Sequence, residues 1–382
     1  MESETLLECL VDAGRAPIDE WPGRYPGSQG MGYLCSYVPE EIVHAAGYTP
    51  VRIRGNTAHL RFVDAHLQSF TCALCRSTLD QALGGALNPL RGIIFAHTCD
   101  AMQALADLWS LELEPSHFFD VVMQPTNLGS PAAHSYLVAE LERFRDNLGL
   151  FSGSPISEGD LRRSIAVCDE TRRLVRDLQT MRHRLRVPDF YSVLDAAQVM
   201  PRDSFNPILT DFLRSLGRSE DSGETAPPAG TASASVRSSG VRLYLVGAVL
   251  DEPRLLDLIE DLGAFVAGDD LCSGSRRFVD SIGAEQAPIP ALAGFYLRRT
   301  PCPTKLHPAH RPGEHLLAQA RLTQADGIIF LVEKFCEPHA FDYATALPAL
   351  DGAGVPHLLL EMEQTPSLEA LRTRLQAFIE ML

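Results

Sequence analysis

Residues 327–336 read GIIFLVEKFC, and residues 92–99 read GIIFAHTC. Both stretches open with a short run of large apolar residues, which is typical of a strand buried on both faces, and both end in a cysteine. Segments with the helical spacing of apolar residues precede and follow each stretch. Strands that alternate with helices in this way predict a parallel sheet that helices cover on both faces.

The same alternation runs through both halves of the chain, and a polar segment separates them. Residues 217–240 contain one large aliphatic residue, Val236, in a composition that cannot bury enough surface to offset its ordering entropy. We expect a disordered linker or insert there, between domains at 1–216 and 241–382. The expected fold class is α/β: two Rossmann-like domains with parallel sheets flanked by helices, plus a helical extension of the first domain over 132–216.

Composition and charge narrow the class of protein. The chain has 382 residues, of which 45% are hydrophobic and 21% charged, as in an ordinary globular protein of two or three domains. No apolar run approaches the ~18 residues of a membrane span, and the start, MESETLLECLVDAGRAP, carries acids where a secretory signal carries positive charge. We therefore expect a cytoplasmic protein. Its net charge of −16 disfavours nucleic acid and a membrane as partners.

The chain has nine cysteines, which a cytoplasmic location would keep reduced. Cys35, Cys99 and Cys336 fall at or just after the carboxyl ends of expected strands, the edge at which open parallel sheets bind ligands. Cys72 and Cys75 lie on an expected helix, at a spacing that can turn one of them toward the same edge. Three thiolates that meet there suit zinc or an iron–sulfur cluster, although any single cysteine is better explained as a small core residue.

The pair Cys72-Ala-Leu-Cys75 also has the C-x-x-C pattern of a thioredoxin-type redox pair or of half a zinc site. A redox pair belongs at a helix N-terminus, whereas we expect helical residues from His66 to Phe70 before this pair. The sequence has no second C-x-x-C for a zinc ribbon. It also has no G-x-x-x-x-G-K-[ST], G-x-G-x-x-G or G-x-S-x-G pattern, so ATP hydrolysis, dinucleotide binding and serine-hydrolase chemistry are not expected.

Six motifs follow one another along the chain: GYLCSYVPEEIVHAAGYTPVRI, HLQSFTCALCRSTLDQALGG, GIIFAHTCDAMQALADLW, DDLCSGSRRF, EKFCEPHAFD and RTRLQAFIEML. In this order they resemble the 2-hydroxyacyl-CoA dehydratase family, which also contains subunits of ATP-dependent benzoyl-CoA reductase; the chain looks like its 2-hydroxyglutaryl-CoA dehydratase D-component type. The resemblance covers nearly the whole chain except residues 217–240. It departs at EALRTRLQAF, where many relatives carry Gly-Gln before the Arg-Thr-Arg.

The resemblance implies a [4Fe-4S] or larger iron–sulfur cluster, held between the two domains by Cys72, Cys99 and Cys336. Cys75 stands where the family pattern does not require a thiol, and Cys35 lies in a motif near the substrate pocket. The remaining cysteines are expected to be structural, although the loops that contain Cys272 and Cys302 can border the cleft between the domains; they are Cys9, Cys168, Cys272 and Cys302.

The resemblance also implies a reaction and partners. A separate activator that hydrolyses ATP supplies an electron of low potential, a 2-hydroxyacyl-CoA thioester becomes a ketyl radical anion, and water is eliminated. The implied partners are this activator, the acyl-CoA substrate, and a homologous second subunit or a second copy of the chain.

Three alternative functions stay open: a benzoyl-CoA reductase subunit, a homodimeric reductase with a double-cubane-type cluster, and a metal-free scaffold with the same fold.

Polar residues around the implied cluster are candidates for catalysis. Ser36 follows the first expected strand, Glu41 opens the next helix, and His97, two residues before Cys99, can donate to a thioester oxygen or move a proton. The polar loop at 269–278 is able to hold a phosphate or a carboxylate, or is simply solvated. The candidate contacts for the phosphates of CoA are Arg276, Arg277 and Arg311.

Overall fold

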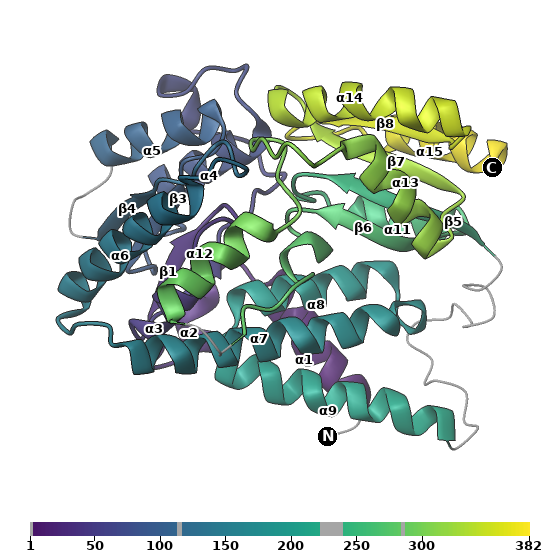
Figure 1. Cartoon of the computed structure of the whole chain (residues 1–382). Helices are drawn as coiled ribbons and strands as arrows, with labels where there is room; N and C mark the ends of the chain where they lie inside the picture. The colour runs from purple at the N-terminus through teal and green to yellow at the C-terminus, as the bar shows by residue number, and fades with distance from the viewer. Residues whose placement is uncertain (1–2, 113–116, 222–239, 284–286) are drawn as a thin grey trace.

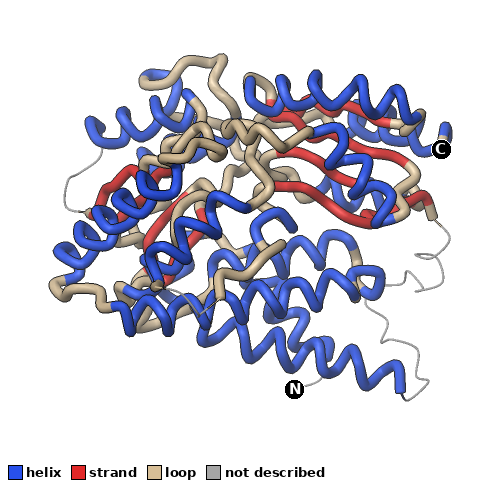
Figure 2. The backbone as a smooth tube through the Cα atoms, in the orientation of Figure 1, coloured by secondary structure: helices blue, strands red, loops and turns tan. Residues whose placement is uncertain are grey.

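The computed structural model describes residues 3–112, 117–221, 240–283 and 287–382. These residues form two four-stranded sheets, one in each lobe, and every pair of neighbouring strands is parallel (Figure 2). Helices flank both sheets (Figure 1). This confirms the expected α/β class with two Rossmann-like sheets.

The two sheets have the same topology. The N-terminal sheet has the order β2-β1-β3-β4, with β1 (Gly30–Tyr33), β2 (Thr49–Arg52), β3 (Gly92–Ala96) and β4 (Phe118–Val122). The C-terminal sheet has the order β6-β5-β7-β8, with β5 (Val241–Gly247), β6 (Ala264–Leu271), β7 (Gly327–Glu333) and β8 (His357–Met362). The direction of strand addition reverses between β1 and β3 and between β5 and β7. Ligands of open α/β sheets bind outside the carboxyl ends of strands at such switch points.

The helices of the first half fall into two groups (Figure 1). Those that follow or precede the strands are α3 (Glu40–Ala45), α4 (Ala73–Leu83), α5 (Asp100–Glu112) and α6 (Ala133–Ser152). The helical extension consists of α1 (Ser3–Arg15), α7 (Glu158–Thr180), α8 (Val187–Val199) and α9 (Arg202–Asp221). Shorter elements are α2 (Trp21–Arg24) and 3₁₀ turns at Ile18–Glu20, Val63–Ala65 and Arg182–Arg184.

One helix of the second half packs in the first domain. The helices there are α11 (Arg254–Asp261), α12 (Pro288–Arg298), α13 (Pro312–Thr323), α14 (Glu337–Ala353) and α15 (Leu368–Met381), with a 3₁₀ turn at Ser275–Arg277. On α12, Leu292 and Phe295 share a core with Met31 and Ile94 of the N-terminal sheet. The sequence predicts residues 241–382 as a separate domain. Helix α12 belongs to that range, but its apolar face is buried against the N-terminal sheet.

Two further expectations are corrected. Helix α9 continues to Asp221, into the segment expected to be a linker at 217–240; residues 222–239 lie outside the described part of the chain. Helix α4 begins only after Cys72, which has an extended backbone (φ −60°, ψ 150°) and is the N-cap residue. The residues before it are loop, since short polar side chains such as those of Ser69 and Thr71 favour turns over helix interiors.

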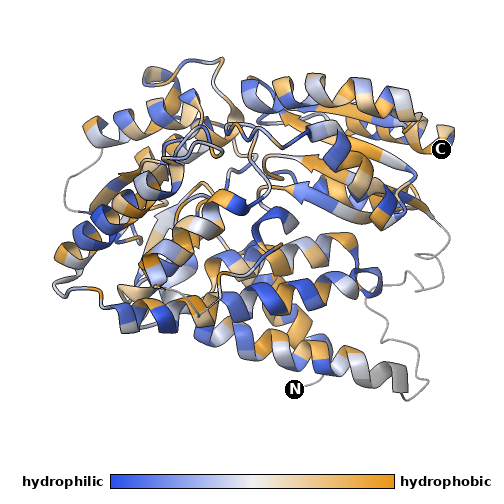
Figure 3. Ribbon diagram, in the orientation of Figure 1, coloured by the Kyte–Doolittle hydropathy of each residue, from blue (hydrophilic) through white to orange (hydrophobic). Residues whose placement is uncertain are grey.

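A single hydrophobic core connects the two lobes. Leu245 and Ile329 of the C-terminal sheet belong to the same core as Phe95 of the N-terminal sheet and Leu194 and Phe205 of the helical extension. Figure 3 shows the strands of the C-terminal sheet as largely hydrophobic.

Within the described residues, none of the helices combines the length and the apolar character that a membrane crossing needs.

Buried charges tie the C-terminal half to α3. Glu40, 3% exposed, pairs with Arg202 at 2.6 Å, Arg277 at 2.8 Å and Arg172 at 3.2 Å. Arg277 comes from the turn after β6, so this carboxylate links the second sheet to the first. Burial alone would raise the pKa of Glu40, but the three guanidinium groups outweigh it and hold the pKa well below its ordinary value.

We expect Glu40→Gln to lower the free energy of unfolding at pH 7 by about 3–5 kcal/mol, because it leaves buried guanidinium charge uncompensated. Urea denaturation measures the change. The pKa of Glu40 is lower in the folded state, so its contribution is present at neutral pH and is lost as the pH falls below the ordinary glutamate pKa. The difference between the two proteins should therefore shrink in acid.

The control is Glu170→Gln on α7, which removes a surface pair with Arg173. An exposed pair contributes about 1 kcal/mol or less, so this variant should stay close to the wild type. A loss for Glu40→Gln no larger than that of the control would contradict the role of Glu40 in joining the two sheets.

Candidate metal centre

Three cysteines stand immediately before three helices. Cys72 is the N-cap residue of α4, Cys336 is the N-cap residue of α14, and Cys99 precedes Asp100, the first residue of α5. Cys99 and Cys336 each follow a strand, β3 and β7, and these strands hold equivalent positions in the two sheets. The repeated GIIF sequence therefore marks equivalent strands in the two lobes, and the cysteine after each strand lies beyond its carboxyl end at the switch point.

A backbone N–H near the start of the following helix lowers the pKa of each of the three thiols. The N–H belongs to Cys75 for Cys72, to Met102 for Cys99 and to His339 for Cys336. Free N–H groups and the positive end of the helix dipole favour a thiolate at such positions. Burial opposes this effect, and it raises the pKa of Cys99 to about 11 and that of Cys336 to about 12.

Cys72 differs from the other two because its thiol forms a hydrogen bond with a second thiol, that of Cys75. A side-chain hydrogen bond with Cys75 lowers the pKa of Cys72 below its ordinary value, and the same contact together with burial raises the pKa of Cys75. Both cysteines lie in the main hydrophobic core, where Cys72 is 9% and Cys75 1% exposed. Ionised Cys99 and Cys336 also raise the pKa of Cys75, so the assignment of Cys72 as the ligand of this pair stays a prediction of the resemblance.

The three thiols lie in one electrostatic neighbourhood. Ionised Cys72 raises the pKa of both Cys99 and Cys336, and ionised Cys99 raises that of Cys336. Like charges disfavour each other's ionisation in this way only when they are close. A cation shared among the three sulfurs would remove this cost, so the arrangement fits a metal centre.

The chemistry of the donors limits the metals that the three sulfurs would bind. Thiolates are the soft ligands that zinc and iron–sulfur clusters prefer. Within the described ranges, the one group of three or more possible ligand atoms that all lie within 4.8 Å of one another is Glu40, Glu41 and Cys168, whose carboxylates are already paired with arginines. The sulfurs of Cys72, Cys99 and Cys336 are therefore not all within 4.8 Å of one another.

A second group of thiols, Cys35, Cys272 and Cys302, lies beside the first. The Sγ atom of Cys272 is 3.4 Å from both Ser36 Oγ and Arg52 Nη2. Burial would raise the pKa of Cys272, but the charge of Arg52 and these hydrogen bonds help to lower it to about 6. Burial, with a smaller contribution from ionised Cys272, raises the pKa of Cys35 to about 12 and also raises that of Cys302.

Cys302 connects the two groups. When ionised, it raises the pKa of Cys99 and of Cys336, as well as that of Cys35. Neither Cys272 nor Cys302 stands in a pattern that would place it at the centre, and both are expected from the sequence to be structural. Their positions depend on how the loops after β6 and α12 fold back between the sheets.

Sequence reasoning also missed Lys305. Its side chain is 7% exposed, and Nζ donates to the carbonyl oxygen of His97 at 3.2 Å. Burial lowers the pKa of Lys305, while nearby Cys35, Cys302 and Cys99 raise it. A buried ammonium group beside several thiolates offsets part of their negative charge. A single lysine in PCPTKLHP carries no spacing signal that could have identified it.

The structure brings two of the three predicted polar residues to the thiols. Ser36 is buried, with its hydroxyl beside Cys272. His97 follows β3 and is half-buried; its N–H donates to Val122, and its carbonyl oxygen binds Lys305. Their catalytic roles stay predictions, but both positions are compatible with them.

Glu41, the third, lies in the charge network of α3. It is fully buried, forms an ion pair with Arg172 and accepts a hydrogen bond from Tyr296 at 3.1 Å. These contacts belong to the junction between the helical extension and α12. They do not support the catalytic role predicted for Glu41.

The three predicted phosphate contacts do not converge. Arg276 and Arg277 are 6% and 4% exposed, and they pair with Asp270 at 2.5 Å and with Glu40 at 2.8 Å. Arg311 is exposed and donates to carbonyl groups of its own loop. An exposed cluster of cations is what a CoA diphosphate would need, so these positions support only Arg311 as a candidate.

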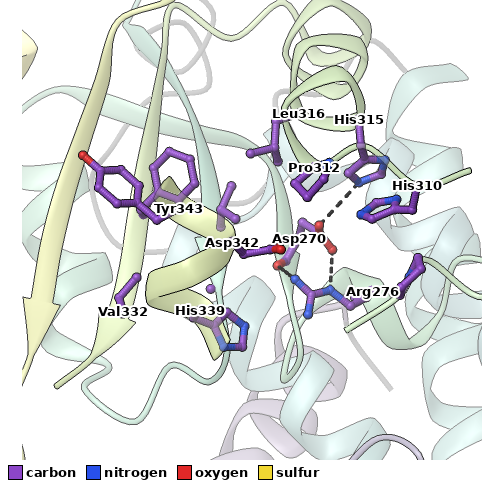
Figure 4. Close-up of a pocket in the computed structure, with 14 residues that line it drawn as sticks. Asp270, Arg276, His310, Pro312, His315, Leu316, Val332, His339, Asp342 and Tyr343 are labelled. Atoms are coloured by element: carbon purple, nitrogen blue, oxygen red, sulfur yellow. Dashed lines mark hydrogen bonds and ion pairs between the residues drawn. The ribbon is translucent and has the colours of Figure 1, made fainter. Parts of the chain in front are cut away.

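A small pocket opens at the carboxyl ends of β5, β6 and β7 (Figure 4). On one side His315 points at Asp270, with Nε2 and Oδ2 3.4 Å apart, and Asp270 also holds Arg276. On another side lies His339, whose Nδ1 atom is 3.3 Å from the sulfur of Cys336. The pocket and the first group of thiols therefore share a wall.

Fold and thiols together define an α/β protein with two parallel sheets and with cysteines at the switch point of each sheet. Residues 35–382 match the family model described as 2-hydroxyglutaryl-CoA dehydratase, D-component. The chain belongs to this family, as the resemblance indicated.

Named relatives span almost the whole chain. The (R)-phenyllactyl-CoA dehydratase beta subunit of Clostridium sporogenes is 28% identical, over 93% of this chain and 92% of the relative. The beta subunit of lactoyl-CoA dehydratase from Anaerotignum propionicum is 27% identical over 99% of both chains. A subunit of benzoyl-CoA reductase from Thauera aromatica is also 27% identical, over 94% of this chain and 92% of the relative.

The contacts of Cys272 predict a reactive thiolate in the metal-free protein. Its reaction with iodoacetamide should become faster as the pH rises through about 6 and then level off. Arg52→Gln should raise the pKa of Cys272 toward its ordinary value and slow the reaction at pH 7 about tenfold. Mass spectrometry of the modified peptides measures both. Cys168, 0% exposed, is the unreactive control; equal pH profiles with and without Arg52 would contradict the assigned role of Arg52.

Proposed function

We propose that this chain is the iron–sulfur-cluster-bearing subunit of a 2-hydroxyacyl-CoA dehydratase. The observation that carries the proposal is the placement of Cys72, Cys99 and Cys336 at the starts of three helices, in one electrostatic neighbourhood. Membership of the dehydratase D-component family supports it, as do two relatives named as dehydratase beta subunits.

Cys72, Cys99 and Cys336 would hold a [4Fe-4S] cluster, which supplies the acyl thioester with a low-potential electron that a separate ATP-dependent activator provides. Three protein thiolates leave one iron of such a cluster without a cysteine ligand. The N–H groups of the helix starts and the ammonium group of Lys305 offset the negative charge that collects there. His97, in the loop between β3 and Cys99, would donate a hydrogen bond to an acyl oxygen or move a proton.

The partners follow from the same proposal. The substrate is an acyl-CoA, and the exposed side chain of Arg311 is a candidate for its phosphates. The active assembly pairs this chain with a homologous subunit or with a second copy of itself, in the cytoplasm. The net charge of −16 supports the exclusion of nucleic acid and of anionic membranes as partners.

The second group of thiols favours one other candidate function. Cys35, Cys272 and Cys302 double the number of sulfurs at the junction of the two lobes, which a larger, double-cubane-type cluster would require. Such a cluster suits a homodimeric reductase. A subunit of ATP-dependent benzoyl-CoA reductase, with the same architecture as the dehydratase subunit, is a separate alternative. The similarity to the benzoyl-CoA reductase subunit of Thauera aromatica is about as high as that to the dehydratase subunits.

Metal analysis of the anaerobically purified chain tests both candidates. About four irons and four acid-labile sulfides per chain, with a visible absorbance that bleaches in air, are expected for a dehydratase subunit. About eight irons would favour the reductase with a larger cluster. Zinc in place of iron, or a colourless and metal-free protein, would contradict both; the first would favour a zinc site and the second a scaffold.

Serine variants test the ligand assignment. Cys99→Ser and Cys336→Ser should abolish cluster loading, whereas Cys168→Ser should leave the iron content unchanged because its thiol is buried away from the centre, near Glu40 and Glu41. Equal iron content in all three variants would overturn the assignment. Cys272→Ser then separates the candidates: it should keep all iron in a dehydratase and lose a large share in a reductase with the larger cluster.

A further inference from the structure

The imidazole ring of His339 contacts the sulfur of Cys336. His339 stands in the first turn of α14, which begins directly after Cys336. Its Nδ1 atom lies 3.3 Å from Sγ of Cys336. The side chain is 8% exposed, so the protein interior holds the ring in this position.

The equivalent residues behind the other two cysteines differ. The residue three positions after Cys99 is Met102, whose thioether has no hydrogen to donate. The one after Cys72 is Cys75, whose thiol is a weak donor. An imidazole N–H is a stronger donor than either. Cys336 is therefore the ligand position with the strongest side-chain hydrogen bond of the three.

The chemistry of the sulfur decides the direction of this hydrogen bond. A thiolate bound to iron carries no proton, so it can only accept, and the hydrogen must come from Nδ1 of His339. A hydrogen bond to a cluster sulfur stabilises negative charge, and the reduced cluster carries more of it than the oxidised one. The bond therefore favours the reduced state.

We propose that His339 is a positioning residue of the metal centre: its Nδ1–H donates to Sγ of Cys336, fixes the orientation of this ligand and raises the reduction potential of the cluster. The inference rests on the proposed function, because it needs a cluster on Cys336. It goes beyond that function because it assigns control of the reduction potential of the cluster to His339, which is not one of the proposed ligands. Second-sphere donors are known to tune metal centres in this way.

Two amide variants separate hydrogen bonding from packing. His339→Asn keeps an N–H donor at the place of Nδ1, whereas His339→Gln carries its donor one bond further out, at the place of Nε2. In redox titrations of the anaerobically purified full chain, followed by electron paramagnetic resonance, His339→Asn should retain the wild-type potential. His339→Gln should lower the equilibrium constant for one-electron reduction about tenfold, which is ~59 mV toward more negative potential.

Matched controls keep the outcomes distinct. Met102→Leu, at the equivalent position behind Cys99, should leave the potential unchanged. His339→Leu should behave like His339→Gln, and the potential is compared for the loaded fraction of each protein, so partial loading does not obscure the result. Equal potentials in wild type, His339→Gln and His339→Leu, all with iron bound, would overturn the role of His339. A wild-type protein without iron would instead overturn the proposed function.

Discussion

Three helices, α4, α5 and α14, begin directly after three cysteines whose thiols influence one another's pKa, and the proposed function depends on this arrangement. Thiolates that are buried side by side repel one another and lose the solvation of water. Backbone N–H groups and the ammonium group of Lys305 would offset part of this cost, and a shared metal centre would offset the rest. The same groups would then both stabilise the proposed cluster and tune it.

The two sheets make this arrangement possible. They share one strand order, and β3 and β7 end at the switch points of their sheets, so Cys99 and Cys336 arrive from opposite lobes. Glu40 and its arginines, together with α12, hold the lobes in a fixed relation. The geometry of the centre therefore depends on buried charge and on one returning helix, in addition to the common hydrophobic core.

Local sequence pattern is sufficient for the strands, most helices and the edge of the sheet at which Cys99 and Cys336 lie. It fails where the contacts join distant parts of the chain: Arg52 and Cys272, which are in hydrogen-bond contact, are 220 residues apart, and Lys305 binds His97 across 208 residues. No periodicity or spacing records such contacts. The start of α4 is also wrong in the sequence-based prediction, because apolar and polar residues before Cys72 continue the helical spacing although the backbone forms a loop.

Anomalous diffraction at the iron absorption edge, from crystals grown without oxygen, tests the central claim most directly. We predict iron beside the sulfurs of Cys72, Cys99 and Cys336, between the two lobes. Iron at Glu40, Glu41 and Cys168, or no iron next to the three helix starts, would contradict it.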